Sequence, residues 1–377
     1  FCGESTMDEL ARAIDMDSMD FRIKNASKTG DHNIDDEEYT RIGIVEMLEE
    51  VKASDAYIRP IKKSENGWPV GRGVGIGWWP CGIGVSSARI MINEDGGVDV
   101  ALGVVDLHGI RTGTAQVAAE TLGIEADAIF VHTVDTDSIP PAGNAAGSRV
   151  TRSLSQAVYM AGTSIIEQMK AKMAVRFGVD PEYVEYEDGF FYARDNQDSR
   201  VSFKAAGAAV TQNGSNVVAT ASNDPGMRPA NGYAMSVADV EIDPDTGKVQ
   251  LTRFTLFQDV GKCVNPTQVE NQMQGGAVQG IGWALSEEYV FDDQGQMRNA
   301  SFLDYRMPTA LDLPMIDCVI LETPADEGAF GIRGVGEPPI IPPPAAIANA
   351  IRDAADVRMT RLPMSPERVF AAINEES

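Results

Sequence analysis

The chain has 377 residues, of which 43% are hydrophobic and 23% are charged, a composition typical of a globular protein of about two domains. Its formal net charge is −25, with 56 acidic against 31 basic residues, so its surface repels phosphate backbones and no nucleic-acid partner is expected. No run of about 18 apolar residues occurs, so no membrane span is predicted.

The cysteines and histidines exclude several kinds of metal site. None of the four cysteines forms a C-x-x-C pair, so the chain carries no recognisable iron–sulfur or zinc motif. Only three histidines occur, which excludes a histidine-rich metal cage. The wide cysteine spacing fits a reducing compartment, and the N-terminus lacks the features of a signal peptide. These features predict a cytoplasmic protein.

Residues 1–65 are predicted to be mainly helical. Apolar residues recur at helical spacing after Ser5, and acidic residues lie in the first turn, which predicts a helix there. A short helix is expected at 18–26. A polar, acidic linker at 28–38 and a further helix at 36–53 follow.

Residues 66–225 and 226–377 are predicted to be two similar domains of mixed sheets and helices, an α+β fold. In each, apolar runs flank a turn rich in Gly, Asp or Pro, which predicts a β-hairpin, and helices follow it. The expected hairpin strands are 88–92 with 98–100, and 237–242 with 249–257. Helices are expected at 111–122, 148–177, 265–287 and 345–356, and further strands at 128–134 and 316–321.

The segment Gly334-Val335-Gly336-Glu337-Pro338-Pro339 is best suited to chemistry. Its prolines lack N–H groups, which keeps this backbone out of helix and sheet interiors, and Pro338 is expected to push Glu337 into an extended conformation. The result is a stiff loop that presents one carboxylate, as a general base requires. A proline-rich turn with a solvated glutamate is the alternative.

Two other segments suit ligand binding. Gly147 and Ser148 precede a long predicted helix, whose first N–H groups can hold an oxyanion, although Ser148 as a plain N-cap is equally open. Gln272 and Gln279 lie seven residues apart on one face of a helix that contains several glycines. Their amides suit a flat polar ligand, and close helix packing is the alternative.

Several motifs occur in the order found in one known family. Gly336-Glu337-Pro338-Pro339, followed by residues 345–351, resembles the catalytic glutamate motif of the molybdenum-binding subunit of the xanthine dehydrogenase/aldehyde oxidase family. Residues 264–282 resemble that family's glutamine helix, and Asp304-Tyr305-Arg306-Met307-Pro308-Thr309 matches another of its stretches. The opening residues 4–11 resemble the helix that ends the family's first molybdenum domain.

The resemblance covers almost the whole chain and implies domain identities. Residues 1–65 would be the C-terminal end of the first molybdenum-binding domain and a linker. Residues 66–225 and 226–377 would be two halves of the second molybdopterin-binding part, the latter with the catalytic glutamate loop.

The resemblance also implies roles for particular residues. Glu337 would be the base beside molybdenum, and Gln272 would contact the pterin or a molybdenum ligand. The metal itself would be held through the pterin. The cofactor would be wrapped by a segment at the start of the long helix, namely Gly147, Ser148, Arg149, Val150 and Thr151.

Two positions leave alternatives open. His108, followed by Gly109, stands where the family usually has the glutamine of a Met-Gly-Gln-Gly loop. It would contact the cofactor, alter the metal's surroundings or mark a divergent site. Trp78 and Trp79 lie where family members place an aromatic residue against a ring substrate, and core packing is the alternative.

The implied activity is that of a molybdenum hydroxylase subunit. It would oxidise an electron-poor carbon of an N-heterocycle or aldehyde, a small-molecule substrate, with water-derived oxygen. The cofactor would be molybdopterin with molybdenum, with its cytosine dinucleotide as one form. The expected partners are a first molybdenum-binding domain or subunit, a subunit with 2Fe-2S clusters and a subunit with FAD.

The family's first molybdenum domain has no counterpart in this sequence. The chain is therefore expected to be a truncated sequence or a split subunit similar to the medium molybdopterin subunit of nicotinate dehydrogenase. A non-catalytic scaffold or cofactor-insertion protein with the same fold is the competing hypothesis.

Overall fold

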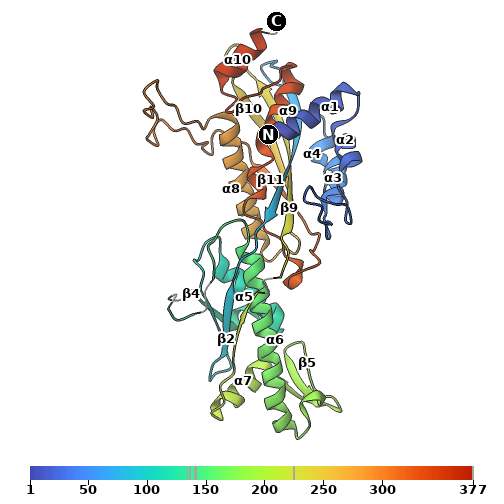
Figure 1. The fold of residues 1–377 in the computed structure, drawn as a ribbon, viewed down its shortest axis with the longest axis vertical. Coiled ribbons are helices and arrows are strands. Elements are labelled where there is room, and N and C mark those ends of the chain that lie inside the picture. Colours follow the sequence, from blue (N-terminus) through green and yellow to red (C-terminus); the bar gives the residue numbers. More distant parts are fainter. Residues whose placement is uncertain (134, 136, 140–141, 224–225, 376–377) are drawn as a thin grey trace. The chain divides into compact units, whose positions relative to one another are not determined.

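A computed structural model describes residues 1–133, 135, 137–139, 142–223 and 226–375, which form two compact units (Figure 1). Unit 1 comprises Phe1–Pro80, Asn231–Ala325 and Val335–Ser377, and unit 2 comprises Cys81–Ala230 and Asp326–Gly334. Both units combine sheets with helices, which confirms the predicted α+β class. None of the described helices is long and apolar enough to cross a membrane.

Unit 1 is built on a four-stranded sheet in the order β1-β9-β10-β11. The predicted hairpin consists of β9 (Ala230–Ile242) and β10 (Val249–Asp259), which pair antiparallel, and β11 (Ile316–Leu321) runs parallel to β10. The edge strand β1 (Val70–Cys81) was not predicted.

Alternate glycines make β1 a platform for α9 (Pro343–Ala355). A Cβ at Gly73 would lie 2.1 Å from the carbonyl oxygen of Ala346, and one at Gly71 would lie 2.4 Å from that of Ala350. The helix therefore rests directly on the strand backbone. This close approach explains why β1 contains alternate glycines, although glycine has a low intrinsic propensity for strands.

Helices cover both faces of this sheet, because alternate side chains of β10 point to opposite sides. Phe254 and Leu256 pack in one core with α8 (Pro266–Leu285) and α9. Phe257 packs in a second core with Met47 and Leu48 of α3 (Ile44–Ala53). The remaining helices of unit 1 are α1 (Cys2–Ala13), α2 (Ser18–Asn25), α4 (Asp55–Ile58) and α10 (Pro366–Glu375).

The predicted helix at 36–53 is wrong in its first part. Asp36 has a φ of 61°, which interrupts a right-handed helix, and Gly43 is the N-cap of α3. Residues before Gly43 instead form turns and an isolated bridge between His32 and Glu38.

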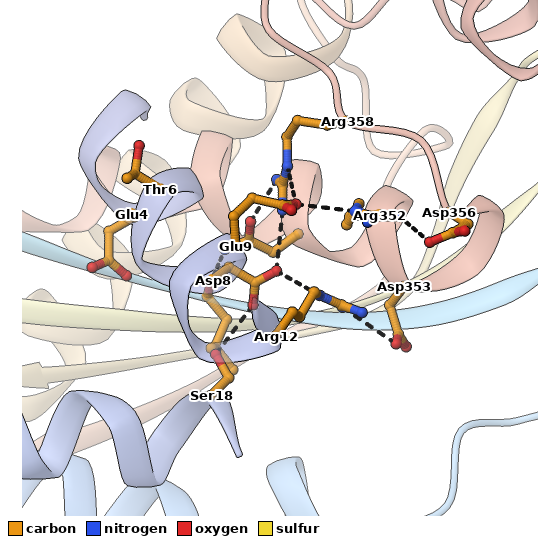
Figure 2. Close-up of polar contacts among 12 residues, drawn as sticks. Glu4, Thr6, Asp8, Glu9, Arg12, Ser18, Arg352, Asp353, Asp356 and Arg358 are labelled. Atoms are coloured by element: carbon orange, nitrogen blue, oxygen red, sulfur yellow. Dashed lines mark hydrogen bonds and ion pairs between the residues drawn. The ribbon is translucent and has the colours of Figure 1, made fainter. Parts of the chain in front are cut away.

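Helix α1 lies beside α9, and charged side chains link the two helices (Figure 2). The Arg358 guanidinium donates to Asp8 Oδ2 at 3.1 Å and to Glu9 Oε1 at 2.8 Å. Arg352 Nε donates to the same Glu9 oxygen at 3.0 Å. The opening helix is thereby fixed to the helix that follows the Glu337 loop.

Unit 2 contains a four-stranded sheet in the order β4-β3-β2-β8 and a three-stranded sheet β5-β6-β7. The predicted hairpin of β2 (Ser87–Ile92) and β3 (Val98–Leu102) is confirmed, and β4 (Ile129–Thr133) runs parallel to β3. Helices α5 (Ile110–Leu122) and α6 (Val150–Phe177) also match their predicted ranges closely. The elements that were not predicted are β5 (Val184–Glu187), β6 (Phe190–Ala193), β7 (Asn196–Ser202), α7 (Phe203–Gln212) and β8 (Val218–Ser222).

Candidate functional site

Glu337 begins a tight turn. It is the N-cap of the 3₁₀ helix η4 (Pro338–Ile340), and its carbonyl accepts a hydrogen bond from Ile340 N at 3.2 Å. Its φ of −93° and ψ of −29° lie in the right-handed helical region, so the predicted extended conformation is wrong. The turn and the burial of both following prolines outweigh the steric restriction that Pro338 imposes.

Helix α8 supports this loop from one side. Gln272 Nε2 donates to the Gly336 carbonyl oxygen at 3.0 Å. A Cβ at Gly276 would lie 2.6 Å from Pro339 Cβ, so this glycine lets η4 pack directly against the helix. The structure therefore supports close packing of α8 through a glycine. The Gln272 amide points to the loop, whereas Gln279 is exposed.

A second glutamine holds the loop and was missed in the sequence. Gln258 is fully buried near the end of β10, and its Nε2 donates to the Val335 carbonyl oxygen at 3.2 Å. The only signal was a single amide in the strand run Thr-Leu-Phe-Gln-Asp. The half-buried Glu337 thus follows two residues whose carbonyls are both hydrogen-bonded by glutamine amides.

The two tryptophans lie at the end of β1, which passes close to η4. A Cβ at Gly77 would lie 2.7 Å from Ile341 Cβ, directly after that turn. Trp78 is 49% exposed and its Nε1 donates to Asn231 Oδ1 at 2.9 Å, so it is not a core residue. Trp79 is half-buried, and its Nε1 has no hydrogen-bond partner among the described residues.

In unit 2, residues 147–151 form the entry to α6. Gly147 and Ser148 have φ values of 67° and 57°, and Arg149 is the N-cap. The interpretation of Ser148 as N-cap is therefore wrong by one position. The backbone of Ser148 instead packs closely on Gly334. A Cβ added at Gly334 would lie 2.3 Å from the Ser148 carbonyl oxygen.

Buried arginines with unused donors occur at the same helix start. Arg149 is 5% exposed and Arg152 is 2% exposed. Arg149 Nη2 and Arg152 Nε and Nη1 have no hydrogen-bond partner within the described part of the chain. Burial lowers the pKa of both guanidinium groups, and for Arg152 the negative charge of Glu327 offsets part of this effect. Such donors at a helix N-terminus suit an anion.

His108 lies at the start of a different helix of unit 2. It is exposed with a φ of 56°, and Gly109 is the N-cap of α5 with a φ of 71°. Consecutive left-handed residues form the turn between β3 and this helix. Among the residues that the structure describes, no group of three or more His, Cys, Asp or Glu is placed to ligate a metal ion.

The structure thus brings together Glu337 and Gln272 with the strand end of Trp78 in unit 1, and residues 147–151 with Arg152 in unit 2. Sequence reasoning missed Gln258 and Arg152. For Arg152 the available signal was a charged residue on a side of α6 that is otherwise rich in buried small and apolar residues.

Comparison with known proteins identifies the family. Residues 47–314 match the molybdopterin cofactor-binding domain. The xanthine dehydrogenase molybdenum-binding subunit of Escherichia coli O157:H7 is 30% identical over 386 residues, covering 98% of this chain and 51% of that subunit. Subunit gamma of the 6-hydroxypseudooxynicotine dehydrogenase complex of Paenarthrobacter nicotinovorans is 33% identical over 342 residues, covering 86% of this chain and 42% of that subunit.

The structure of the chain is also similar to solved protein structures. Quinoline 2-oxidoreductase of Pseudomonas putida 86 superposes with a TM-score of 0.90 and 26% identity, covering 99% of this chain and 51% of that one. The chain spans about half the length of such relatives, 51% for the E. coli subunit. The resemblance indicated by the ordered motifs is confirmed, and the chain belongs to the molybdopterin cofactor-binding domain family.

Proposed function

We propose that this chain is the part of a molybdenum hydroxylase that carries the catalytic glutamate. The enzyme would oxidise an electron-poor carbon of an N-heterocycle or an aldehyde with water-derived oxygen. The observation that carries this proposal is the Glu337 loop, which forms a tight turn packed on α8. The Gly336 carbonyl, directly before Glu337, accepts a hydrogen bond from Gln272 at 3.0 Å. A fixed carboxylate is what proton abstraction requires.

The residues of unit 2 fit an anionic pterin. Unpaired buried N–H groups cost about 1–3 kcal/mol each, so Arg149 and Arg152 favour an anion that would accept from them. We assign Gly147, Ser148, Arg149, Val150 and Thr151 to holding molybdopterin at the start of α6. When bound, that cofactor supplies two-electron redox and Lewis-acid chemistry through its molybdenum.

The remaining assignments follow the same logic. His108 and Gly109 form the second left-handed helix start of unit 2, and Gln272 of α8 donates to the loop that carries Glu337, so we assign all three to cofactor contact. The exposed Trp78, together with Trp79, would present an aromatic face to a flat heterocycle. The cytosine dinucleotide form of the cofactor adds a second phosphate, which the two buried guanidinium groups favour.

Glu337 performs the proton step. Its carboxylate oxygen accepts the proton of the oxygen that becomes bonded to the substrate carbon. The turn at Glu337 and the buried prolines after it limit the freedom of the backbone that carries this carboxylate, so less conformational entropy is lost in reaching the reactive geometry.

We further propose three partners for this chain. It spans about half the length of its relatives, of which the E. coli subunit is matched over 51%. A first molybdenum-binding domain or subunit would supply the remaining part. Since the sequence has no C-x-x-C pair, 2Fe-2S clusters would reside on a further subunit. FAD would reside on another subunit, and the complex would lie in the cytoplasm.

The test is Glu337→Gln in the complex purified with its partners. We expect turnover of N-heterocycles and aldehydes, measured with an artificial electron acceptor, to fall at least about 100-fold, the usual contribution of a general base. Glu367→Gln, at an exposed position of α10, is the matched control and should keep its rate.

Molybdenum content separates the competing outcomes. Normal turnover of Glu337→Gln at full molybdenum occupancy would contradict the proposal. A wild-type complex that binds pterin yet oxidises no member of the panel would favour the scaffold or cofactor-insertion role instead.

A further inference from the structure

Two glutamines from different elements bind consecutive carbonyl groups of the Glu337 loop. Gln258 of β10 donates to the Val335 oxygen at 3.2 Å, and Gln272 of α8 donates to the Gly336 oxygen at 3.0 Å. Both donors are Nε2 atoms, and both acceptors lie directly before Glu337. The loop is therefore held from the sheet and from the helix at once.

Gln258 is the more buried of these two anchors. Its backbone lies in the interior of the sheet, opposite Ala234 on β9 and Ile320 on β11. Alternation along β10 places its side chain on the same face as Leu256, which packs with α8 and α9. The side chain is 0% exposed, so its amide has little freedom to reorient.

The chemistry of this position is unfavourable for stability alone. A buried amide must form hydrogen bonds to offset its lost hydration, and Gln258 Oε1 has none among the described residues. An apolar side chain of similar volume would fill the same space without leaving that oxygen unsatisfied. What the amide provides, and an apolar side chain would not, is the hydrogen bond to the Val335 carbonyl.

We propose that Gln258 is a positioning residue for Glu337. Together with Gln272 it fixes the carbonyls of Val335 and Gly336, and so the direction in which Glu337 leaves the loop. This inference rests on the proposed function, because it takes Glu337 to be the base. It adds a residue of β10 to a site that already includes the Glu337 loop, Gln272 of α8 and the end of β1.

The first test measures the loop directly in the full complex. Gln258→Met keeps the length and volume of the side chain but removes the N–H donor. Hydrogen exchange of the backbone amides in peptide 333–341 should become about fivefold to tenfold faster, the factor for losing one hydrogen bond of ordinary strength. Gln272→Met should do the same, and because it lies on a half-buried helix face it provides the result if Gln258→Met fails to fold.

Gln274→Met is the matched control. Gln274 lies on α8, is half-buried like Gln272, and donates to the Ile316 oxygen at 3.5 Å rather than to the loop. In Gln274→Met, hydrogen exchange of the backbone amides in peptide 333–341 should equal that of the wild type. Exchange in Gln258→Met that equals the exchange in Gln274→Met would overturn the inference.

The second test is kinetic. We expect kcat of Gln258→Met to fall about tenfold with little change in KM, because a misplaced base affects the reaction step more than substrate binding. The double variant with Gln272→Met should lose less than the product of the two single losses, since both amides hold one loop. Two results would contradict the positioning role. One is a rise in KM with no change in kcat, and the other is a loss in kcat of the double variant that equals the product of the two single losses.

Glu337→Gln separates the two claims. If it retains normal turnover, Glu337 is not the base and both claims are overturned. If it is inactive while Gln258→Met and Gln274→Met behave alike in exchange and kcat, the inference about Gln258 alone is wrong.

Discussion

Replacing Arg358 by methionine should destabilise unit 1 substantially. The Arg358 side chain is 18% exposed and donates to Asp8 and Glu9, as Figure 2 shows. It also donates to Asn349 Oδ1 at 2.8 Å. Its loss leaves a 6% exposed carboxylate at Asp8 and the oxygen of a fully buried Asn349 without this partner. Truncating one side of a buried pair costs about 3–5 kcal/mol. Since Asp8 keeps Arg12, we expect about 2–3 kcal/mol here.

Urea unfolding of the purified protein measures this change. Arg361→Met is the control, because Arg361 is 72% exposed and only 3.5 Å from Glu288, which predicts a change within about 0.5 kcal/mol. Methionine keeps an apolar stem in both variants, so the comparison isolates the guanidinium contacts. If the two variants differ by less than about 0.5 kcal/mol, the link between α1 and α9 does not stabilise the unit as argued.

Gly73→Ala places a methyl group 2.1 Å from a backbone oxygen of α9 and should cost about 1–3 kcal/mol in urea unfolding, whereas Gly3→Ala meets nothing within 4 Å and should cost none. Burial acts to raise the pKa of Glu9, but hydrogen bonds from Arg358 and Arg352 (Figure 2) outweigh it and leave that pKa below its usual value of 4.5. The stability that Glu9 contributes is therefore present above pH 4.5 and lost as pH falls through the lowered pKa, so the stability gap between wild type and Glu9→Gln should close in acid and not in base. Arg152→Met should lower the molybdenum content of the purified complex at least about tenfold, the effect of losing a charged hydrogen bond, while the exposed Arg176→Met should not.

Local patterns predicted much of the fold. The hairpins of β2 with β3 and of β9 with β10 were found from turn residues between apolar runs, and α5, α6 and α8 from helical periodicity. Both signals depend on residues that are neighbours in the chain. The short strands of the β5-β6-β7 sheet carry little periodicity over four to seven residues and were missed.

Strand β1 shows why neighbouring residues were not enough. Its alternating glycines are poor strand formers, and only contact with α9, some 270 residues later, explains them. The backbone of Glu337 gives the same lesson, since the following proline predicts an extended residue but a turn packed on α8 imposes a helical one.

For the site, the sequence by itself determined the order of the motifs, the glutamate among its glycines and prolines, and hence the family. Tertiary structure alone decided which polar groups lose water: Gln258 at the end of a central strand and Arg152 within α6 are buried by residues far away in the chain. Burial and hydrogen-bond partners are properties of long-range packing, which local residue patterns do not encode.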